Sequence, residues 1–266
     1  MTTIVKTRGA SEPYGTNFLT PALAPLNSTR FRVVETRYPA SIGPVNPAPG
    51  TPVGPSLNAS VEIGVMNILA TVTAAPDDVV LVDYSLGGIV NSAFLSRYGT
   101  VGSKVVGRVS LANPTRAAGD NYHFPSFGEG IFGHPVDYQR LGIPHWELAS
   151  PGDVMTSCHA VSPLRWIAED VVAGFSLDAK AFAAWAAATV AKLPQIEQRA
   201  VGQNGALLWT PDWYQQIFQA PGQLWAYARG GSHTDAYLRP LWRTSSGAPI
   251  TALALMTKIL RDYFGS

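Results

Sequence analysis

Cysteine is almost missing from the 266 residues, because Cys158 is the only one. A single cysteine excludes an internal disulfide framework and a zinc site built from several thiolates. Charged residues make up only 14% of the chain, against about 25% in ordinary globular proteins. The 19 Lys and Arg nearly cancel the 18 Asp and Glu, which leaves a net charge of +1. Since no basic surplus exists to neutralise phosphates, we expect no nucleic-acid partner.

Long apolar segments are also missing. Residues 1–8 contain no apolar stretch of the length that a signal peptide needs. The longest alanine-rich run, Ala181–Ala191, has eleven residues, whereas a membrane-spanning helix needs about 20. We therefore expect no transmembrane segment and a protein that is made soluble without a signal peptide. Another agent would have to release it if it acts outside the cell that makes it.

Hydrophobic residues nevertheless make up 46% of the chain, and they recur in strand and helix patterns. Short apolar or β-branched segments predict strands at Thr3–Thr7, Phe31–Thr36, Val79–Asp83, Val105–Ala112 and His145–Ala149. Helical spacing of apolar residues predicts helices over Asn58–Thr73, Gly87–Tyr98 and Thr251–Phe264. Alternating strands and helices are typical of an α/β protein with a parallel sheet and helices on both faces.

The pattern changes after residue 160. Ser162–Val172, Asp178–Ala191 and Pro211–Phe218 are predicted to be helices, with little strand signal between them. We predict one α/β body, formed by residues 1–160 and 226–266, that carries a helical insertion over residues 161–225. Aromatic residues gather between Trp209 and Tyr227. They either pack the insertion onto the body or form a partly exposed wall for acyl chains or sugars.

The segment Val79–Gly88 carries the strongest chemical signal. An apolar strand ends, Ser85 follows, and two glycines open a helix. This is the setting of a nucleophile elbow, a sharp strand-to-helix turn that holds a serine in strained geometry. The N–H of Leu86 would then point at the oxyanion of an acyl-transfer reaction. Elbows usually carry glycine two residues before the serine, where this chain has Asp83. The alternative is a serine that lies in such a turn by chance.

A serine nucleophile needs a histidine base, which follows the serine and the acid in α/β-hydrolases. His233 is late in the chain, in a loop of small residues before a predicted helix, and we favour it as the base. The other histidines lie in less suitable places: His123 and His134 in a Pro- and Gly-rich loop, His145 in a predicted strand, and His159 at a predicted helix start. For each of them a surface or hydrogen-bonded structural role is the alternative.

The acid and the second oxyanion donor are expected in loops at strand ends, where sites form in open α/β sheets. Asp153 comes directly after the fifth predicted strand and would hold His233 in the correct tautomer. Asp83 is the rival acid, whereas Asp170, Asp212 and Asp235 are expected at the surface. In the loop after the first strand, the N–H of Ala10 or of Ser11 would supply the second donor.

Two other motifs are rejected. The segment Gly128–Gly133 matches G-x-G-x-x-G, but no clear strand precedes it and His134-Pro135 disfavours a following helix, so we predict no dinucleotide site. Cys158 lies beside His159 without a separate orienting group, and a buried, inert thiol is expected. Because no His and Asp residues have metal-ligand spacing, we expect neither a metal nor a cofactor.

Taken together, these segments resemble the mycobacteriophage lysin B family of cutinase-related serine esterases. The loop Arg8–Pro13, the elbow at Tyr84–Gly87, the stretch Ala112–Arg116 and the segment Gly152–Met155 are similar to family segments. The long insertion before His233 resembles lysin B, since free-standing cutinases lack it. The resemblance implies a cutinase-like α/β-hydrolase fold.

The resemblance also implies a function and a triad. Ser85, Asp153 and His233 would be the catalytic residues, and Leu86 and Ala10 would form the oxyanion hole. Ala10 stands where cutinases often carry a hydroxyl residue. The implied reaction is hydrolysis of the ester that joins mycolic acid to arabinogalactan in the mycobacterial envelope during phage-mediated lysis. The alternatives are a generic actinobacterial cutinase or lipase and a catalytically degenerate module that binds the envelope.

Overall fold

A parallel five-stranded sheet forms the centre of the protein, in the order β2-β1-β3-β4-β5. The computed structural model describes residues 1–43, 49–50, 54–122, 128–166 and 230–265, and a few residues between 168 and 227. The strands are β1 (Thr2–Thr7), β2 (Phe31–Glu35), β3 (Val79–Tyr84), β4 (Val105–Leu111) and β5 (His145–Leu148). All five strands were predicted from the sequence, and each boundary lies within one residue of its prediction.

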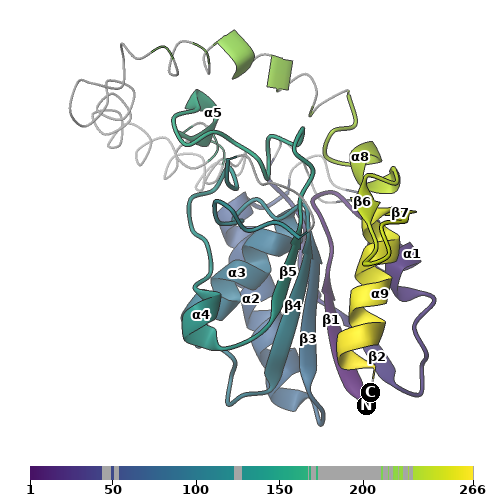
Figure 1. Cartoon of the computed structure of the whole chain (residues 1–266). Coiled ribbons are helices and arrows are strands. Elements are labelled where there is room, and N and C mark those ends of the chain that lie inside the picture. The colour runs from purple at the N-terminus through teal and green to yellow at the C-terminus, as the bar shows by residue number, and fades with distance from the viewer. Residues whose placement is uncertain are drawn as a thin grey trace.

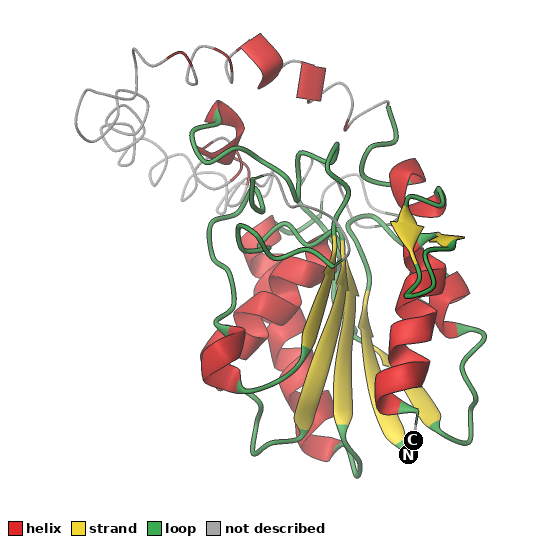
Figure 2. Cartoon of the chain, in the orientation of Figure 1, coloured by secondary structure: helices red, strands yellow, loops and turns green. Residues whose placement is uncertain are grey.

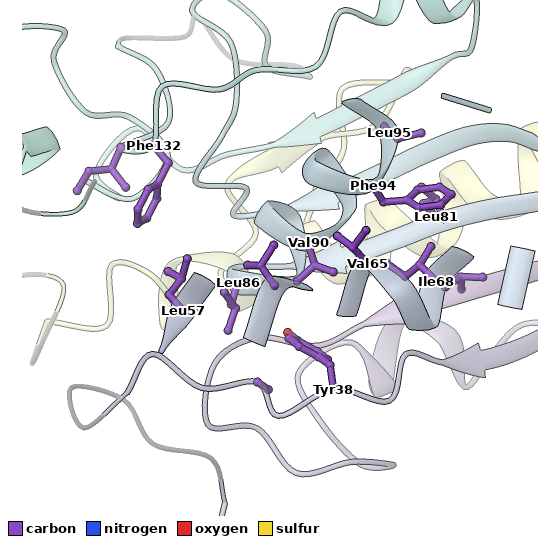
Figure 3. Packing of buried hydrophobic residues seen from close by; sticks show 14 of the residues in the cluster. Tyr38, Leu57, Val65, Ile68, Leu81, Leu86, Val90, Phe94, Leu95 and Phe132 are labelled. Atoms are coloured by element: carbon purple, nitrogen blue, oxygen red, sulfur yellow. The ribbon is translucent and has the colours of Figure 1, made fainter. Parts of the chain in front are cut away.

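Helices cover both faces of the sheet, as predicted (Figure 1). α2 (Leu57–Ala74) and α3 (Leu86–Tyr98) lie on one face, and α1 (Thr20–Leu23) and α9 (Ala252–Phe264) on the other. The strand residues alternate between the two cores: Leu81 packs with α2 and α3, whereas Val80 and Val82 pack with α9. Figure 3 shows the first core, in which Val65 and Ile68 of α2 meet Val90 and Phe94 of α3. The structure therefore has the predicted α/β architecture, a parallel sheet with helices on both faces.

Within the described residues, α2 is the one helix long and apolar enough to cross a membrane, with 18 residues and a mean hydropathy of 1.3. Its apolar stripe, which includes Val61, Val65 and Val72, is buried in the core beside α3. Ser56 caps its first turn by accepting a hydrogen bond from the N–H of Ala59. The buried stripe and the cap are those of a helix that packs in a protein core.

The smaller elements were harder to predict. α5 (Pro163–Trp166) begins the helix expected at Ser162–Val172, and α8 (Asp235–Leu238) is the helix expected after His233. α1, α4 (Tyr138–Leu141) and the two-residue strands β6 (Trp242–Arg243) and β7 (Pro249–Ile250) were missed. The predicted helix Asp178–Ala191, and most of the insertion at 161–225, lie outside the described residues. The insertion therefore stays a prediction.

The order of the strands places a site at their carboxyl ends. The chain moves from β1 to β2 on one side and continues with β3, β4 and β5 on the other, so the direction switches between β1 and β3. Ligands of open α/β sheets bind at such switch points. Thr7, the last residue of β1, lies in register with Asp83 of β3. The loop after β1 and the turn after β3 therefore start side by side, at the end where α5 and α8 lie (Figure 2).

Candidate active site

Ser85 occupies the sharp turn between β3 and α3. Its φ of 55° and ψ of −119° are unusual for a residue with a side chain and cost about 1–3 kcal/mol. Close packing holds the turn in this shape, since a Cβ on Gly87 would lie 2.1 Å from the carbonyl oxygen of Thr7. A Cβ on Gly88 would lie 2.6 Å from the side-chain oxygen of Asn113. The two glycines therefore allow α3 to begin directly against the neighbouring strands.

The structure brings Ser85 together with His233 and Asp153. Nε2 of His233 lies 2.7 Å from Oγ of Ser85, across 148 residues of sequence. Nδ1 of the same ring lies 2.8 Å from Oδ2 of Asp153, across 80 residues. Asp153 is fully buried, and Ser85 and His233 are buried except for 8% and 6% of their surfaces. A hydroxyl, an imidazole and a carboxylate in this order can transfer a proton away from the serine.

Two tyrosines support this arrangement. The hydroxyl of Tyr237 donates to Oδ2 of Asp153 at 2.7 Å and accepts from the N–H of Ser150 at 3.1 Å. The hydroxyl of Tyr84 donates to the backbone carbonyl of His233 at 2.8 Å. Burial raises the pKa of both phenols well above the usual range, so both remain protonated donors. Sequence reasoning missed both tyrosines, although Tyr84 is adjacent to Ser85 and could have been suspected.

The two backbone N–H groups expected in the oxyanion hole have no hydrogen-bond acceptor among the described residues. Among the described residues, neither the N–H of Leu86 nor that of Ala10 donates to an acceptor. The N–H of Leu86 belongs to the first turn of α3, which has no acceptor within the helix. The N–H of Ser11, the other candidate, donates to the carbonyl of Ala40 at 2.7 Å. Of the two donors considered from the sequence, the N–H of Ser11 is therefore occupied, and the N–H of Ala10 has no acceptor among the described residues.

The loop that carries Ala10 is held from inside the protein. Arg8 is buried and donates to the carbonyl oxygens of Glu12 and Tyr38, at 2.8 and 2.6 Å. The carboxylate of Glu12 accepts from the N–H groups of Gly9 and Phe18, each at 2.6 Å. These bonds fix the backbone on both sides of Ala10 and keep its N–H in place without a rearrangement.

Asp83, the rival acid, has other partners. Its Oδ2 lies 2.8 Å from Nε of Arg108 and accepts from Nδ2 of Asn91 at 2.7 Å. The same guanidinium donates to the carbonyl of Gly88 and to Oγ of Ser92, each at 2.9 Å. Since Asn91, Gly88 and Ser92 belong to α3, the Asp83–Arg108 pair ties this helix to β3 and β4. Sequence reasoning did not identify Arg108.

The remaining histidines and the cysteine lie elsewhere. Nε2 of His145 is 2.8 Å from Oδ2 of Asp120, on the edge strand β5. His134 and His159 are exposed, and His123 lies outside the described residues. Cys158 is buried, and burial raises the pKa of its thiol, as expected of an inert residue.

No protein-family model matches the chain, and no curated protein matches it in sequence. Among solved structures, lysin B from mycobacteriophage D29 superposes with a TM-score of 0.57 at 16% identity, over 97% of this chain and 98% of the phage protein. A cutinase-like protein from Cryptococcus sp. gives 0.44 at 17% identity, over 75% of this chain and 93% of the other. The catalytic core of acetyl xylan esterase from Trichoderma reesei gives 0.45 at 15% identity, over 70% and 97%. At these identities the comparison concerns the fold, and the chain shares the fold of the phage lysin B along nearly its whole length.

Proposed function

We propose that the protein is a serine esterase, a hydrolase of carboxylic esters. The observation that carries the proposal is the continuous chain from Oγ of Ser85 through the ring of His233 to Asp153, with distances of 2.7 and 2.8 Å. Each group has the partner that its role requires: a nucleophile on a strained turn, a base within hydrogen-bond reach, and a buried carboxylate that orients the base.

The acylation step follows from these positions. His233 takes the proton of the Ser85 hydroxyl at Nε2 while Oγ forms a bond to the ester carbonyl carbon. The carbonyl oxygen becomes an oxyanion, which the N–H groups of Leu86 and Ala10 bind. Asp153 accepts the Nδ1–H hydrogen bond and stabilises the positive imidazolium. When the tetrahedral intermediate collapses, the C–O bond of the ester breaks and the alcohol leaves with the proton from Nε2.

Deacylation repeats the same steps with a water molecule as the nucleophile. His233 takes a proton from a water molecule, whose oxygen attacks the acyl group on Ser85. The same N–H groups bind the second oxyanion. The bond between Oγ and the acyl carbon then breaks, Oγ recovers the proton from His233, and the carboxylic acid leaves. No group besides these residues and water is needed to balance the reaction.

For the substrate, we propose a lipid ester of the mycobacterial envelope, the ester between mycolic acid and arabinogalactan, cleaved during phage-mediated lysis. Two observations support this choice. The fold matches a phage lysin B over 97% of this chain and 98% of that protein. The segments Arg8–Pro13, Tyr84–Gly87 and Gly152–Met155 resemble those of the lysin B family, and they hold Ala10, Ser85 and Asp153.

Labelling and hydrolysis test the esterase. We expect a fluorophosphonate probe to label the wild type and to spare Ser85→Ala. With a short-chain p-nitrophenyl ester, kcat should fall by at least about 10³-fold in Ser85→Ala and in His233→Ala. Ser96→Ala is the matched control, because Ser96 is an exposed serine on the same helix, and its activity should equal that of the wild type. No labelling of the wild type would favour the degenerate, envelope-binding alternative.

Purified mycolyl-arabinogalactan tests the substrate. The proposal expects the wild type, but not Ser85→Ala, to release free mycolic acid, which thin-layer chromatography or mass spectrometry detects. Hydrolysis of short soluble esters without any release of mycolic acid would leave the esterase standing and contradict the proposed substrate. The generic cutinase alternative would then be preferred.

A further inference from the structure

The hydrogen bonds of Tyr237 fix the direction of its hydroxyl proton. The phenol oxygen accepts from the N–H of Ser150 at 3.1 Å, and it lies 2.7 Å from Oδ2 of Asp153. A backbone N–H can only donate and a carboxylate oxygen can only accept, so the phenol proton lies on the short contact to Oδ2 of Asp153. The ring is fully buried and stacks on Trp242, with a centroid distance of 5.6 Å and an interplanar angle of 26°. Tyr237 therefore presents a fixed donor to Asp153.

The carboxylate of Asp153 receives two donors on one oxygen. Oδ2 accepts both from Tyr237 and from Nδ1 of His233, at 2.7 and 2.8 Å. Oδ1 accepts from the N–H of Met155 at 3.0 Å. Together with the other two donors, the phenol prevents the carboxylate from rotating. Its hydrogen bond also draws part of the negative charge of Oδ2 away from the imidazole. Hydrogen bonds from such donors stabilise a fully buried carboxylate.

We propose that Tyr237 is a positioning residue of the esterase site: it holds Oδ2 of Asp153 against His233 and limits how strongly the carboxylate stabilises the imidazolium. The inference rests on the proposed function, in which His233 must be neutral to act as a base. Because Tyr237 does not touch the substrate, its loss should change the rate and the pH profile and leave substrate binding unaffected. Two other titratable groups face the His233 ring, Tyr227 and Tyr84, with ring centroids 5.3 and 5.5 Å away. Burial raises the pKa of both phenols, so neither changes its charge where the histidine titrates.

Removal of the hydroxyl in Tyr237→Phe is the test. We expect kcat to fall about tenfold with KM changed by less than about twofold, because a hydrogen bond to a charged group is lost away from the substrate. The acid-side midpoint of the kcat/KM profile should move to higher pH by roughly half a unit, since the full charge of Asp153 now favours the protonated ring. A structural role alone would not move this midpoint.

Tyr84→Phe is the matched control. It also removes a buried hydroxyl from the same site, but one that holds the backbone of His233 and leaves the donors of Asp153 unchanged. The acid-side midpoint of the kcat/KM profile of Tyr84→Phe should stay at the wild-type value, even if its kcat falls. A second variant replaces Tyr237 with 3-fluorotyrosine, whose more acidic hydroxyl keeps every contact and donates more strongly. The midpoint should then move to lower pH.

Imidazole NMR separates this inference from the proposed function. The titration midpoint of the His233 ring should rise in Tyr237→Phe, stay in Tyr84→Phe and fall with 3-fluorotyrosine, and this can be measured without turnover. A wild type that hydrolyses no ester would end the proposed function but not the positioning role. The same midpoint in all four proteins, or a fall in Tyr237→Phe, would overturn the positioning role even if the esterase stands.

Discussion

Asp83 is a buried carboxylate at the position where nucleophile elbows usually carry glycine, two residues before the serine. Both it and Arg108 are completely buried, and their contact of 2.8 Å joins β3 to β4. The guanidinium also binds the carbonyl of Gly88 in the first turn of α3. The pair therefore supports the helix that begins directly after Ser85. Where other elbows carry glycine, this chain carries one partner of a buried ion pair.

We expect Asp83→Gly to destabilise the protein and not to activate it. Removal of one partner leaves the charge of Arg108 buried and unpaired, which typically costs about 3–5 kcal/mol. Urea unfolding followed by circular dichroism measures this free energy. The double variant Asp83→Gly/Arg108→Leu should recover part of the loss, because neither charge of this pair then remains buried. A single variant as stable as the wild type would show that the pair does not hold the elbow.

The residues that could be predicted are those whose setting is local. Ser85 follows a strand and precedes two glycines, and Asp153 and His233 follow it in a known order, so their loops could be identified. Tyr237 and Arg108 could not. Their partners lie 84 and 25 residues away in sequence, and contacts at such separations depend on how the strands and loops pack. A tyrosine in a short helix and an arginine in an apolar strand carry no pattern of their own.

At the scale of elements, the junction of α3 with β1 leaves no space for a side chain. A Cβ on Gly87 would lie 2.1 Å from the carbonyl oxygen of Thr7 and 2.9 Å from that of Arg8. Both neighbours are backbone atoms, so neither can rotate away. The start of α3 and the end of β1 are therefore locked together, and this contact sets the distance between the turn at Ser85 and the loop that carries Ala10.

Gly87→Ala should consequently separate α3 from β1. We expect a loss of at least about 2 kcal/mol in the free energy of unfolding, since overpacking against backbone forces a shift of the helix. Esterase activity should fall with it, because the two oxyanion donors move apart. Gly152→Ala is the control for stability: its Cβ would have nothing within 4 Å, so its urea midpoint should match the wild type. Equal midpoints in the two variants would contradict the tight junction.

Periodicity predicted the long elements and failed for several short ones. α2, α3, α9 and the five strands contain enough apolar residues for their spacing to be recognised. β6 and β7 have two residues each, and α4 has four residues, none of them buried. Such segments take their structure from the elements against which they lie. No apolar period predicts them.

At the scale of the whole molecule, a row of polar side chains crosses the sheet beneath α3. Asp83, Ser110 and Glu147 lie on neighbouring strands in one register row. All three are buried, and each has an oxygen without a hydrogen-bond partner among the described residues. Burial raises the pKa of Glu147 to about 7, although the nearby charge of Arg108 opposes this. The carboxyl of Glu147 is therefore partly protonated at neutral pH.

This raised pKa predicts how stability depends on pH. The unfolded carboxyl titrates near 4.5 and the folded one at about 7, so the folded state holds more protons between these values. The contribution of Glu147 to the free energy of unfolding is therefore complete below pH 4.5. As the pH rises from 4.5 to 7, this contribution falls by about 3 kcal/mol. Urea unfolding at pH 4.5, 6 and 8 tests this. Between pH 4.5 and 8 the wild type should lose about 3 kcal/mol of its free energy of unfolding relative to Glu147→Gln, because the amide of the variant cannot ionise. Parallel curves would mean that Glu147 titrates alike in both states.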